Sequence, residues 1–79
     1  MNSEQVAALI RAGLPAAEVE VRSDDDVHFS TLVVSEDFEG LRPLQRHQLI
    51  YRTLGQRMGG EIHALAIRAL TPAELAAGG

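Results

Sequence analysis

Three histidines are the side chains of this sequence best suited to bind a metal, because the chain contains no cysteine. His28 opens an expected strand beside an acidic turn, and His63 opens another, directly after a pair of glycines. Imidazoles at strand beginnings beside loops can stay accessible, so these two could bind a metal jointly. The alternative is that His63 packs beside Leu65 and Ile67 and that His28 is an ordinary surface residue.

Two further features have simpler interpretations. His47 lies on the apolar side of an expected helix, where a packed or hydrogen-bonded structural role is favoured over ligation. The run of three aspartates at 24–26 indicates a turn, since it lacks the spaced ligands and the sharp-bend glycine of a calcium loop. Because the sequence also has no Gly-rich phosphate loop, no HExxH and no Gly-x-Ser-x-Gly, it predicts a protein that is not an enzyme.

Arginines are the only other functional side chains that cluster along the sequence. Residues 1–39 hold nine acidic residues and two arginines, whereas residues 40–60 hold four arginines and no acid. Arg42, Arg46 and Arg57 fall roughly opposite the apolar stripe of the expected helix, so they could contact phosphates or an acidic partner, or form a solvated face. The net charge of −4 and the pI near 5.2 disfavour non-specific binding to DNA.

Hydrophobic periodicity and stop signals predict the elements that must position these side chains. Helices are expected over 3–12, with Gly13 in a left-handed conformation at its end, and over 43–58, ended by two glycines. Strands are expected over 18–22, 27–35 and 61–69, the first two as a hairpin, and a short helix follows Thr71. The fold class is therefore α+β in the order α-β-β-α-β-α. A three-stranded sheet carries helices on one face, and a parallel βαβ unit is not expected.

The expected second helix has a mixed surface. Its core stripe is assigned to Leu44, His47, Tyr51, Leu54 and Met58. Leu49 falls on the polar side, which indicates a break near 46–48 or an exposed leucine.

Length and composition indicate one domain over residues 1–79, ordered over about 3–76. The chain is 46% hydrophobic and 23% charged, as in folded soluble domains. No apolar run approaches the ~20 residues of a membrane span, and the N-terminus does not look like a signal peptide. We therefore expect a cytoplasmic protein without a membrane partner; a monomer is possible in isolation, although the sequence does not fix the oligomeric state.

Four blocks of sequence resemble the BolA family, with the closest similarity to its IbaG-like branch. The blocks occur in order and, with the 27–29 and 32–35 segments, extend the likeness over residues 4–75. They are Phe38-Glu39-Gly40, the segment from Leu44 to Tyr51, Ile62-His63-Ala64-Leu65 and Thr71-Pro72-Ala73-Glu74.

This resemblance implies a type II KH-like fold and an adaptor that pairs with a monothiol glutaredoxin to traffic or sense a [2Fe–2S] cluster. It implies that His63 is the principal cluster ligand and that a second ligand comes from the hairpin loop. His28 is the candidate there, with an aspartate or no ligand as alternatives. Because the chain lacks cysteine, glutaredoxin and glutathione would supply the thiolates, and the isolated chain would hold no cluster.

Some members of the family are DNA-binding transcriptional regulators linked to stress, which is the alternative function; Arg42, Arg46 and Arg57 would then contact DNA, weakly. Two departures from the family and fold patterns are visible. Leu75 stands where tryptophan is usual, and the segment 40–43 lacks the second glycine of the GxxG loop by which KH domains clamp nucleic-acid backbone.

Overall fold

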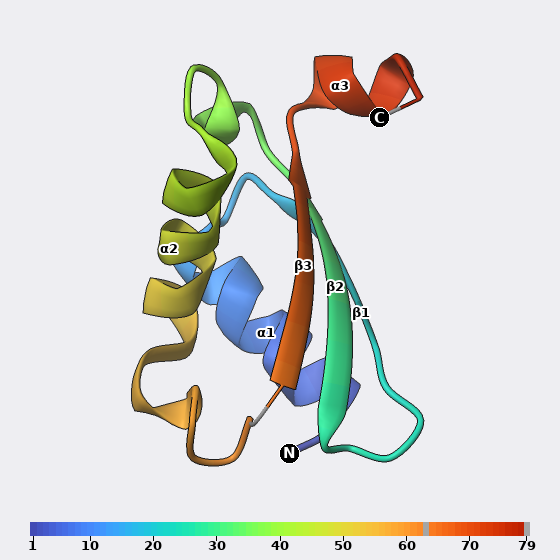
Figure 1. Cartoon of the computed structure of the whole chain (residues 1–79), viewed down its shortest axis with the longest axis vertical. Coiled ribbons are helices and arrows are strands. Elements are labelled where there is room, and N and C mark those ends of the chain that lie inside the picture. Colours follow the sequence, from blue (N-terminus) through green and yellow to red (C-terminus); the bar gives the residue numbers. More distant parts are fainter. Residues whose placement is uncertain (63, 79) are drawn as a thin grey trace.

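The computed structural model describes residues 1–62 and 64–78, so His63, one of the two expected metal ligands, lies outside the described residues. Within them the predicted order of elements is confirmed (Figure 1). The elements are α1 (Ser3–Gly13), β1 (Glu18–Arg22), β2 (His28–Val34), a 3-10 turn (Glu36–Phe38), α2 (Pro43–Leu54), a second 3-10 turn (Gly55–Arg57), β3 (Ala64–Leu70) and α3 (Pro72–Ala76).

The sheet has the strand order β1-β2-β3 and is mixed. The β1–β2 hairpin is antiparallel as expected, but β2 and β3 are parallel, with His28 beside Ala64 and Val34 beside Leu70. The expectation that no parallel βαβ unit is present was therefore wrong. The reason is topological: α2 carries the chain back along the sheet before β3 begins, and such a helical crossover makes its flanking strands parallel.

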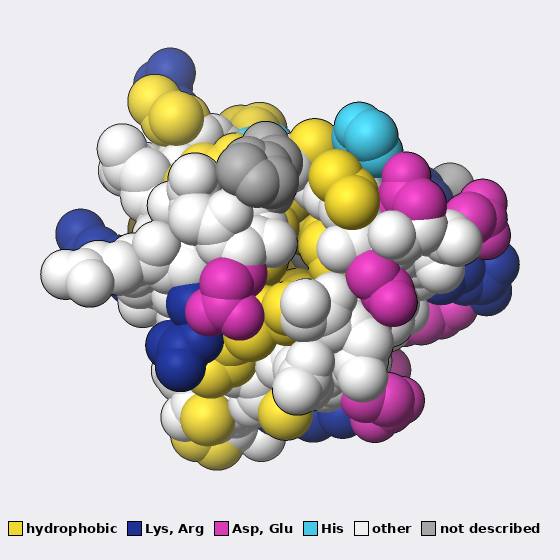
Figure 2. Space-filling view, turned by 90° about the horizontal axis from the view of Figure 1, so that it is seen from below, with side chains coloured by type: hydrophobic (Ala, Val, Ile, Leu, Met, Phe, Trp, Pro, Cys, Tyr) yellow, Lys and Arg dark blue, Asp and Glu magenta, His cyan; other side chains and the backbone are white. Residues whose placement is uncertain are grey.

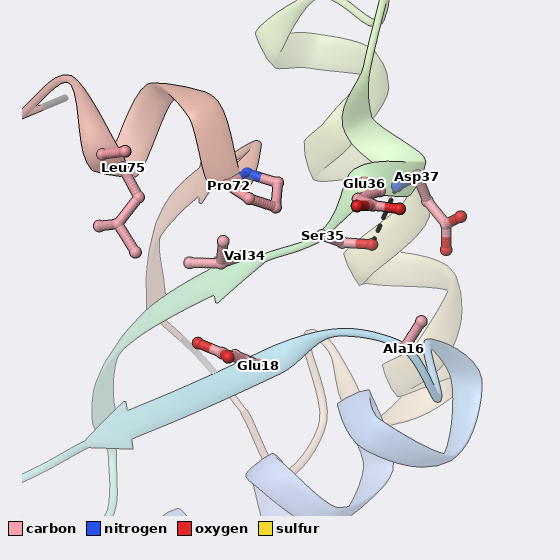
Figure 3. A pocket seen from close by; sticks show the side chains of 9 residues that line it. Ala16, Glu18, Val34, Ser35, Glu36, Asp37, Pro72 and Leu75 are labelled. Carbon is pink, nitrogen blue, oxygen red and sulfur yellow. Dashed lines mark hydrogen bonds between the residues drawn. The ribbon is translucent and has the colours of Figure 1, made fainter.

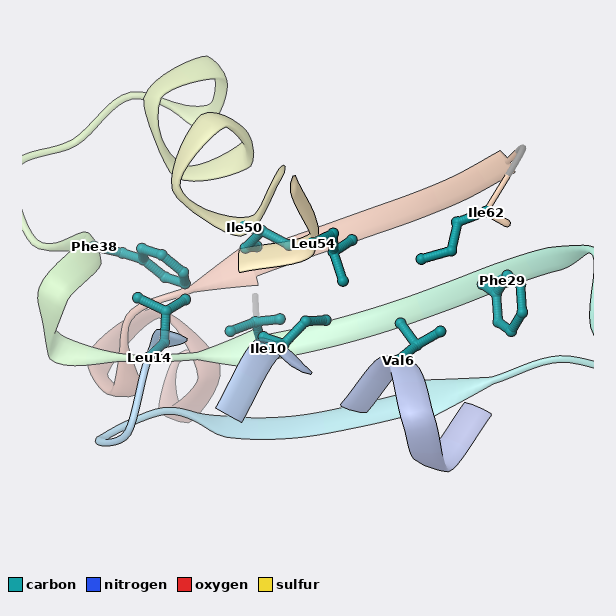
Figure 4. Packing of buried hydrophobic residues seen from close by; sticks show 9 residues of the cluster. Val6, Ile10, Leu14, Phe29, Phe38, Ile50, Leu54 and Ile62 are labelled. Carbon is teal, nitrogen blue, oxygen red and sulfur yellow. The ribbon is translucent and has the colours of Figure 1, made fainter. Parts of the chain in front are cut away.

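One face of the sheet packs against α1 and α2, which both lie on the same side (Figure 1). The core fills the space between them (Figure 4). Alternate residues of the strands point into it, as the period of two requires. Its buried members are Val6, Ile10, Leu14, Phe29, Val33, Phe38, Ile50, Leu54 and Ile62.

The end of α1 differs from its expected form. Gly13 remains within the helix and does not adopt a left-handed conformation. A Cβ on Gly13 would overlap Cγ2 of Thr53 and lie 2.9 Å from Cβ of Thr53. Glycine is therefore required here by the close approach of α1 to α2 rather than by the backbone.

α2 ends at Leu54, earlier than the expected residue 58. Gly55 adopts a φ of 57°, a left-handed conformation that a helix cannot continue and that glycine adopts at little cost. The two glycines at 59–60 come later, in the turn where the Gly59 N–H donates to the Ile62 carbonyl at 2.7 Å.

The buried face of α2 also differs from the prediction. Arg46 is buried together with Ile50 and Leu54, whereas Leu44 is 67% exposed and Tyr51 is 38% exposed. Leu49 packs against the core, and the helix has no break. The expected separation of core and basic faces was therefore wrong, because a hydropathy pattern assigns every arginine to the solvent side.

Each helix begins at a local signal in the sequence. Asn2 and Gln5 form a capping box at α1, Pro43 begins α2, and Thr71 and Glu74 form a capping box at α3. Across residues 1–62 and 64–78, none of the helices has both the length and the apolar character needed to cross a membrane.

Candidate metal-ligand site

His28 lies where the β1–β2 hairpin turns back into β2. The turn is held by side chains: Ser23 Oγ donates to the His28 carbonyl at 2.6 Å and accepts from the Asp26 N–H at 3.0 Å. Asp25 Oδ1 accepts from the N–H groups of Val27 and His28, each at 2.9 Å. Such local bonds are the usual reason that Asp and Ser favour turns, and they fix the backbone that carries His28.

The second carboxylate oxygen of Asp25 orients the imidazole of His28. Oδ2 lies 2.8 Å from Nδ1 of His28, and the His28 side chain is 74% exposed. This hydrogen bond, followed by the backbone N–H groups of His28 and Val27, holds the pKa of Asp25 well below its usual range. An ionised carboxylate only accepts, so Nδ1 must carry the proton.

This arrangement leaves Nε2 as the nitrogen that can bind a metal when the ring is neutral. A carboxylate on the far nitrogen is the common outer partner of metal-binding histidines, because it fixes both tautomer and orientation. Figure 2 views the end of the molecule with the hairpin turn and shows histidine, acidic and hydrophobic side chains exposed there side by side.

The structure places β3 next to this imidazole. Ala64 is the register partner of His28, and Ile62 is fully buried and forms a bridge with Met58. Because His63 lies outside the described residues, its assignment as a ligand remains a prediction. Among residues 1–62 and 64–78, no group of three histidine, cysteine or acidic side chains could hold a metal ion.

The other histidine and the arginines do not join this site. His47 is half-buried on α2, and its structural role stays a prediction. Arg42 and Arg57 are exposed, and Nε of Arg57 lies 3.9 Å from Glu61.

Arg46 is occupied inside the molecule. Its guanidinium donates to the carbonyls of Leu41 at 2.9 Å and Ala69 at 3.0 Å, and to both carboxylate oxygens of Glu74. It also lies over the ring of Phe38, 5.9 Å from the centroid. The three arginines named from the sequence therefore do not form one open basic face.

Sequence reasoning missed two roles. Asp25 was interpreted as a turn residue, although a carboxylate three positions before a histidine is a usable signal. Arg46 was placed on the surface, and no sequence pattern paired it with Glu74.

The mixed three-stranded sheet with helices on one face defines a small α+β domain. At the start of β2 this domain carries an accessible imidazole that is hydrogen-bonded to a carboxylate. The family model described as BolA-like protein matches residues 11–74. The chain belongs to the family of BolA-like proteins, which confirms the resemblance noted in the sequence; assignment to the IbaG-like branch stays a prediction.

Individual relatives agree with this placement. A BolA protein homologue from Coxiella burnetii is 34% identical, with a TM-score of 0.86 over 96% of this chain and 97% of that chain. Human BolA-like protein 1 is 55% identical over 49 residues, which cover 62% of this chain and 36% of the human protein. The chain thus matches little more than a third of that relative. A Haemophilus influenzae relative, 47% identical over 47 residues (60% of this chain, 46% of that protein), is named DNA-binding transcriptional regulator BolA.

Proposed function

We propose that this protein is a BolA-type adaptor that pairs with a monothiol glutaredoxin to traffic or sense a [2Fe–2S] cluster. The observation that carries the proposal is the Asp25–His28 pair, which presents Nε2 of an exposed imidazole at the hairpin end of the sheet. Membership of the BolA-like family supports it. His28 is the proposed second ligand and His63 the principal one.

The donor set of the chain explains why a partner is needed. Iron–sulfur clusters are held mainly by thiolates, and this chain has no cysteine. Glutaredoxin and glutathione would supply thiolates, and this chain would supply imidazole. Replacing thiolate by imidazole raises the reduction potential of a cluster, which suits transfer or sensing.

The test is reconstitution of the cluster with a monothiol glutaredoxin and glutathione, followed by visible absorption and circular dichroism. We expect His63→Ala to remove or alter the histidine-dependent spectrum and His28→Ala to give a partial form of the same change. His47→Ala is the matched control, since it removes the third imidazole and should leave the spectrum unchanged. If the His63 and His28 variants both gave the wild-type spectrum, the ligand assignment would be wrong.

Asp25→Asn tests how the imidazole is oriented. An amide can donate to Nδ1 and thereby move the proton to Nε2, which blocks the nitrogen proposed to bind iron. We expect the variant to shift the circular dichroism of the complex in the same direction as His28→Ala while the free protein stays folded. A spectrum identical to wild type would show that Asp25 serves the turn alone.

The alternative function is a DNA-binding regulator, favoured by the name of the Haemophilus relative and by the exposure of Arg42 and Arg57. Arg46 is omitted because its guanidinium is engaged internally. If the two exposed arginines contact phosphates, Arg42→Gln with Arg57→Gln should weaken binding evenly across sequences and flatten its salt dependence. We expect only weak, non-specific binding at physiological salt. Tight, sequence-selective binding by the isolated protein would favour the regulator instead.

A further inference from the structure

The face of the sheet opposite α1 and α2 carries a groove at the end nearest α3 (Figure 3). The groove has a volume of about 420 Å³. Val34, Pro72 and Leu75 form its apolar part, and the side chains of Val34 and Leu75 point toward the same space (Figure 3). Leu75 is 42% exposed, so apolar surface remains open to solvent between the sheet and the short helix.

The edge of this groove is acidic. Glu18 of β1 and Glu36 and Asp37 of the 3-10 turn line it, all three on exposed residues. The lining residues that the structure describes include no arginine, and the chain has no lysine. In the strand register, the arginine nearest to the groove on this face of the sheet is Arg68. It lies opposite Leu32, farther along the sheet. The end of the sheet beside α3 therefore combines an apolar floor with uncompensated negative charge.

The hollow continues along β1 and β2. A second depression of about 210 Å³ shares Glu18, Val34 and Leu75 with the first and extends to Leu32. A hollow that runs with the strands in this way suits an extended chain segment better than a compact small molecule. Because acidic rims attract and orient cationic partners, the charge selects lysine and arginine in that segment.

We propose that this groove binds an extended segment of a partner protein in which an apolar side chain is flanked by lysine or arginine. The apolar side chain lies on Val34, Pro72 and Leu75, and the flanking cations pair with Glu18, Glu36 and Asp37. The proposed cluster ligand His28 lies at the other end of β2. The groove is thus a second binding surface, and its existence does not depend on the proposed cluster chemistry.

The test uses a short capped peptide with one leucine flanked on each side by two lysines, titrated into the isotope-labelled full chain without glutaredoxin. We expect amide chemical-shift changes concentrated at Val34, Ser35, Leu75 and Ala76. A matched peptide with serine in place of leucine should lose this binding. Higher salt should weaken it, because the carboxylates are exposed.

Charge-matched variants separate the groove from general attraction between a cationic peptide and an acidic protein. Glu36→Gln with Asp37→Asn should weaken binding about fivefold, since each exposed ion pair contributes little. Glu4→Gln with Asp24→Asn removes the same charge elsewhere and should leave the affinity unchanged. Equal weakening by both pairs, no detectable binding, or shift changes spread over the surface would overturn the proposal. So would concentration-dependent dimerisation that places the same shift changes in the groove without peptide, because the occupant would then be a second copy of this chain.

Discussion

At the scale of single residues, Arg46 carries more of the structure than its charge suggests. Its guanidinium bonds the loop before α2, the edge of β3 and the start of α3. Replacing Arg46 with methionine keeps much of the apolar stem but removes the guanidinium that donates to two carbonyls and to the Glu74 carboxylate. The Arg46 side chain is 10% exposed, whereas that of Glu74 is 45% exposed. Leaving acceptors at this partly buried site unsatisfied costs free energy, so we expect a loss of about 1–3 kcal/mol in the free energy of unfolding.

Urea unfolding followed by far-ultraviolet circular dichroism measures this loss. Arg52→Met is the matched control, because Arg52 is an exposed arginine of the same helix. It should change stability by no more than about 0.5 kcal/mol. Equal effects from the two variants would show that the contacts of Arg46 add no stability.

The same pair makes stability depend on pH. The Arg46 guanidinium, followed by the Thr71 backbone N–H, lowers the pKa of Glu74 from its ordinary value of 4.5 to about 2. A carboxyl with a lowered folded-state pKa stabilises the fold fully above its ordinary pKa and loses that contribution as the pH falls through the folded-state value. The stability difference between wild type and Glu74→Gln should therefore be constant above about pH 5 and shrink toward pH 2.

Unfolding of both proteins across this pH range checks the expectation. Glu4→Gln is the comparison, as Glu4 is an exposed acidic residue outside this pair. A difference between wild type and Glu74→Gln that stays constant down to pH 2 would contradict the assignment.

Residue-scale roles were predictable only where they are local. The capping boxes at Asn2 and Thr71 are local features, because each cap lies three residues before the glutamine or glutamate that completes it. The pairing of Arg46 with Glu74 joins residues 28 positions apart, and no local pattern carries that information. The orientation of His28 by Asp25 is local but was missed, since an aspartate run was attributed wholly to turn formation.

At the scale of elements, the close contact between α1 and α2 depends on the absence of a side chain at Gly13. Gly13→Ala introduces a Cβ that would overlap the side chain of Thr53. Overpacking of this kind costs about 1–3 kcal/mol, and the greater helix propensity of alanine offsets only part of it. We expect a net loss of stability from Gly13→Ala by denaturant unfolding.

A double-mutant cycle identifies the cause. Thr53→Ser removes Cγ2 but keeps the hydroxyl that donates to the Ile50 carbonyl at 2.6 Å. It should recover part of the loss in Gly13→Ala, because the overlapping methyl group is gone. If the alanine cost the same with threonine and with serine at position 53, the close approach would not be its cause.

Elements themselves were largely predictable, but their relations were not. Alternation of Val19 and Val21 and the apolar residues of β2 correctly indicated strands, since these signals come from neighbouring residues. The direction of β3 depends on how α2 carries the chain back along the sheet. Local sequence signals do not contain this information, so the parallel pairing of β2 with β3 was missed. The early end of α2 was also missed, because the helix was predicted to end at the two glycines at 59–60 and not at Gly55.

At the scale of the whole molecule, the two proposed binding surfaces lie at opposite ends of the sheet. β2 runs from His28 to Val34, a separation of roughly 20 Å at the rise of a strand. Effects at sites so far apart usually add. We therefore expect His28→Ala to leave the peptide affinity of the groove unchanged, and Glu36→Gln with Asp37→Asn to leave the cluster spectrum unchanged.

Measuring each readout on both variants and on their combination tests this independence. Additive effects are expected, and a change in peptide affinity on adding the cluster-loaded glutaredoxin would contradict it. Independent ends would let one small chain contact two partners at once. Neither surface was predictable as a whole: the histidine end was foreseen from residue types, whereas the groove forms only where α3 meets β1 and β2.

The central position of β2 also has a consequence for biosynthesis. One neighbour of β2 is made just before it, but the other, β3, is made only after α2. Chains emerge from the ribosome N-terminus first, so one edge of β2 stays unpaired until α2 and β3 have also been translated. Unpaired edges recruit strands from other chains. Premature termination before Leu70 is thus expected to yield aggregation-prone fragments rather than a smaller folded domain.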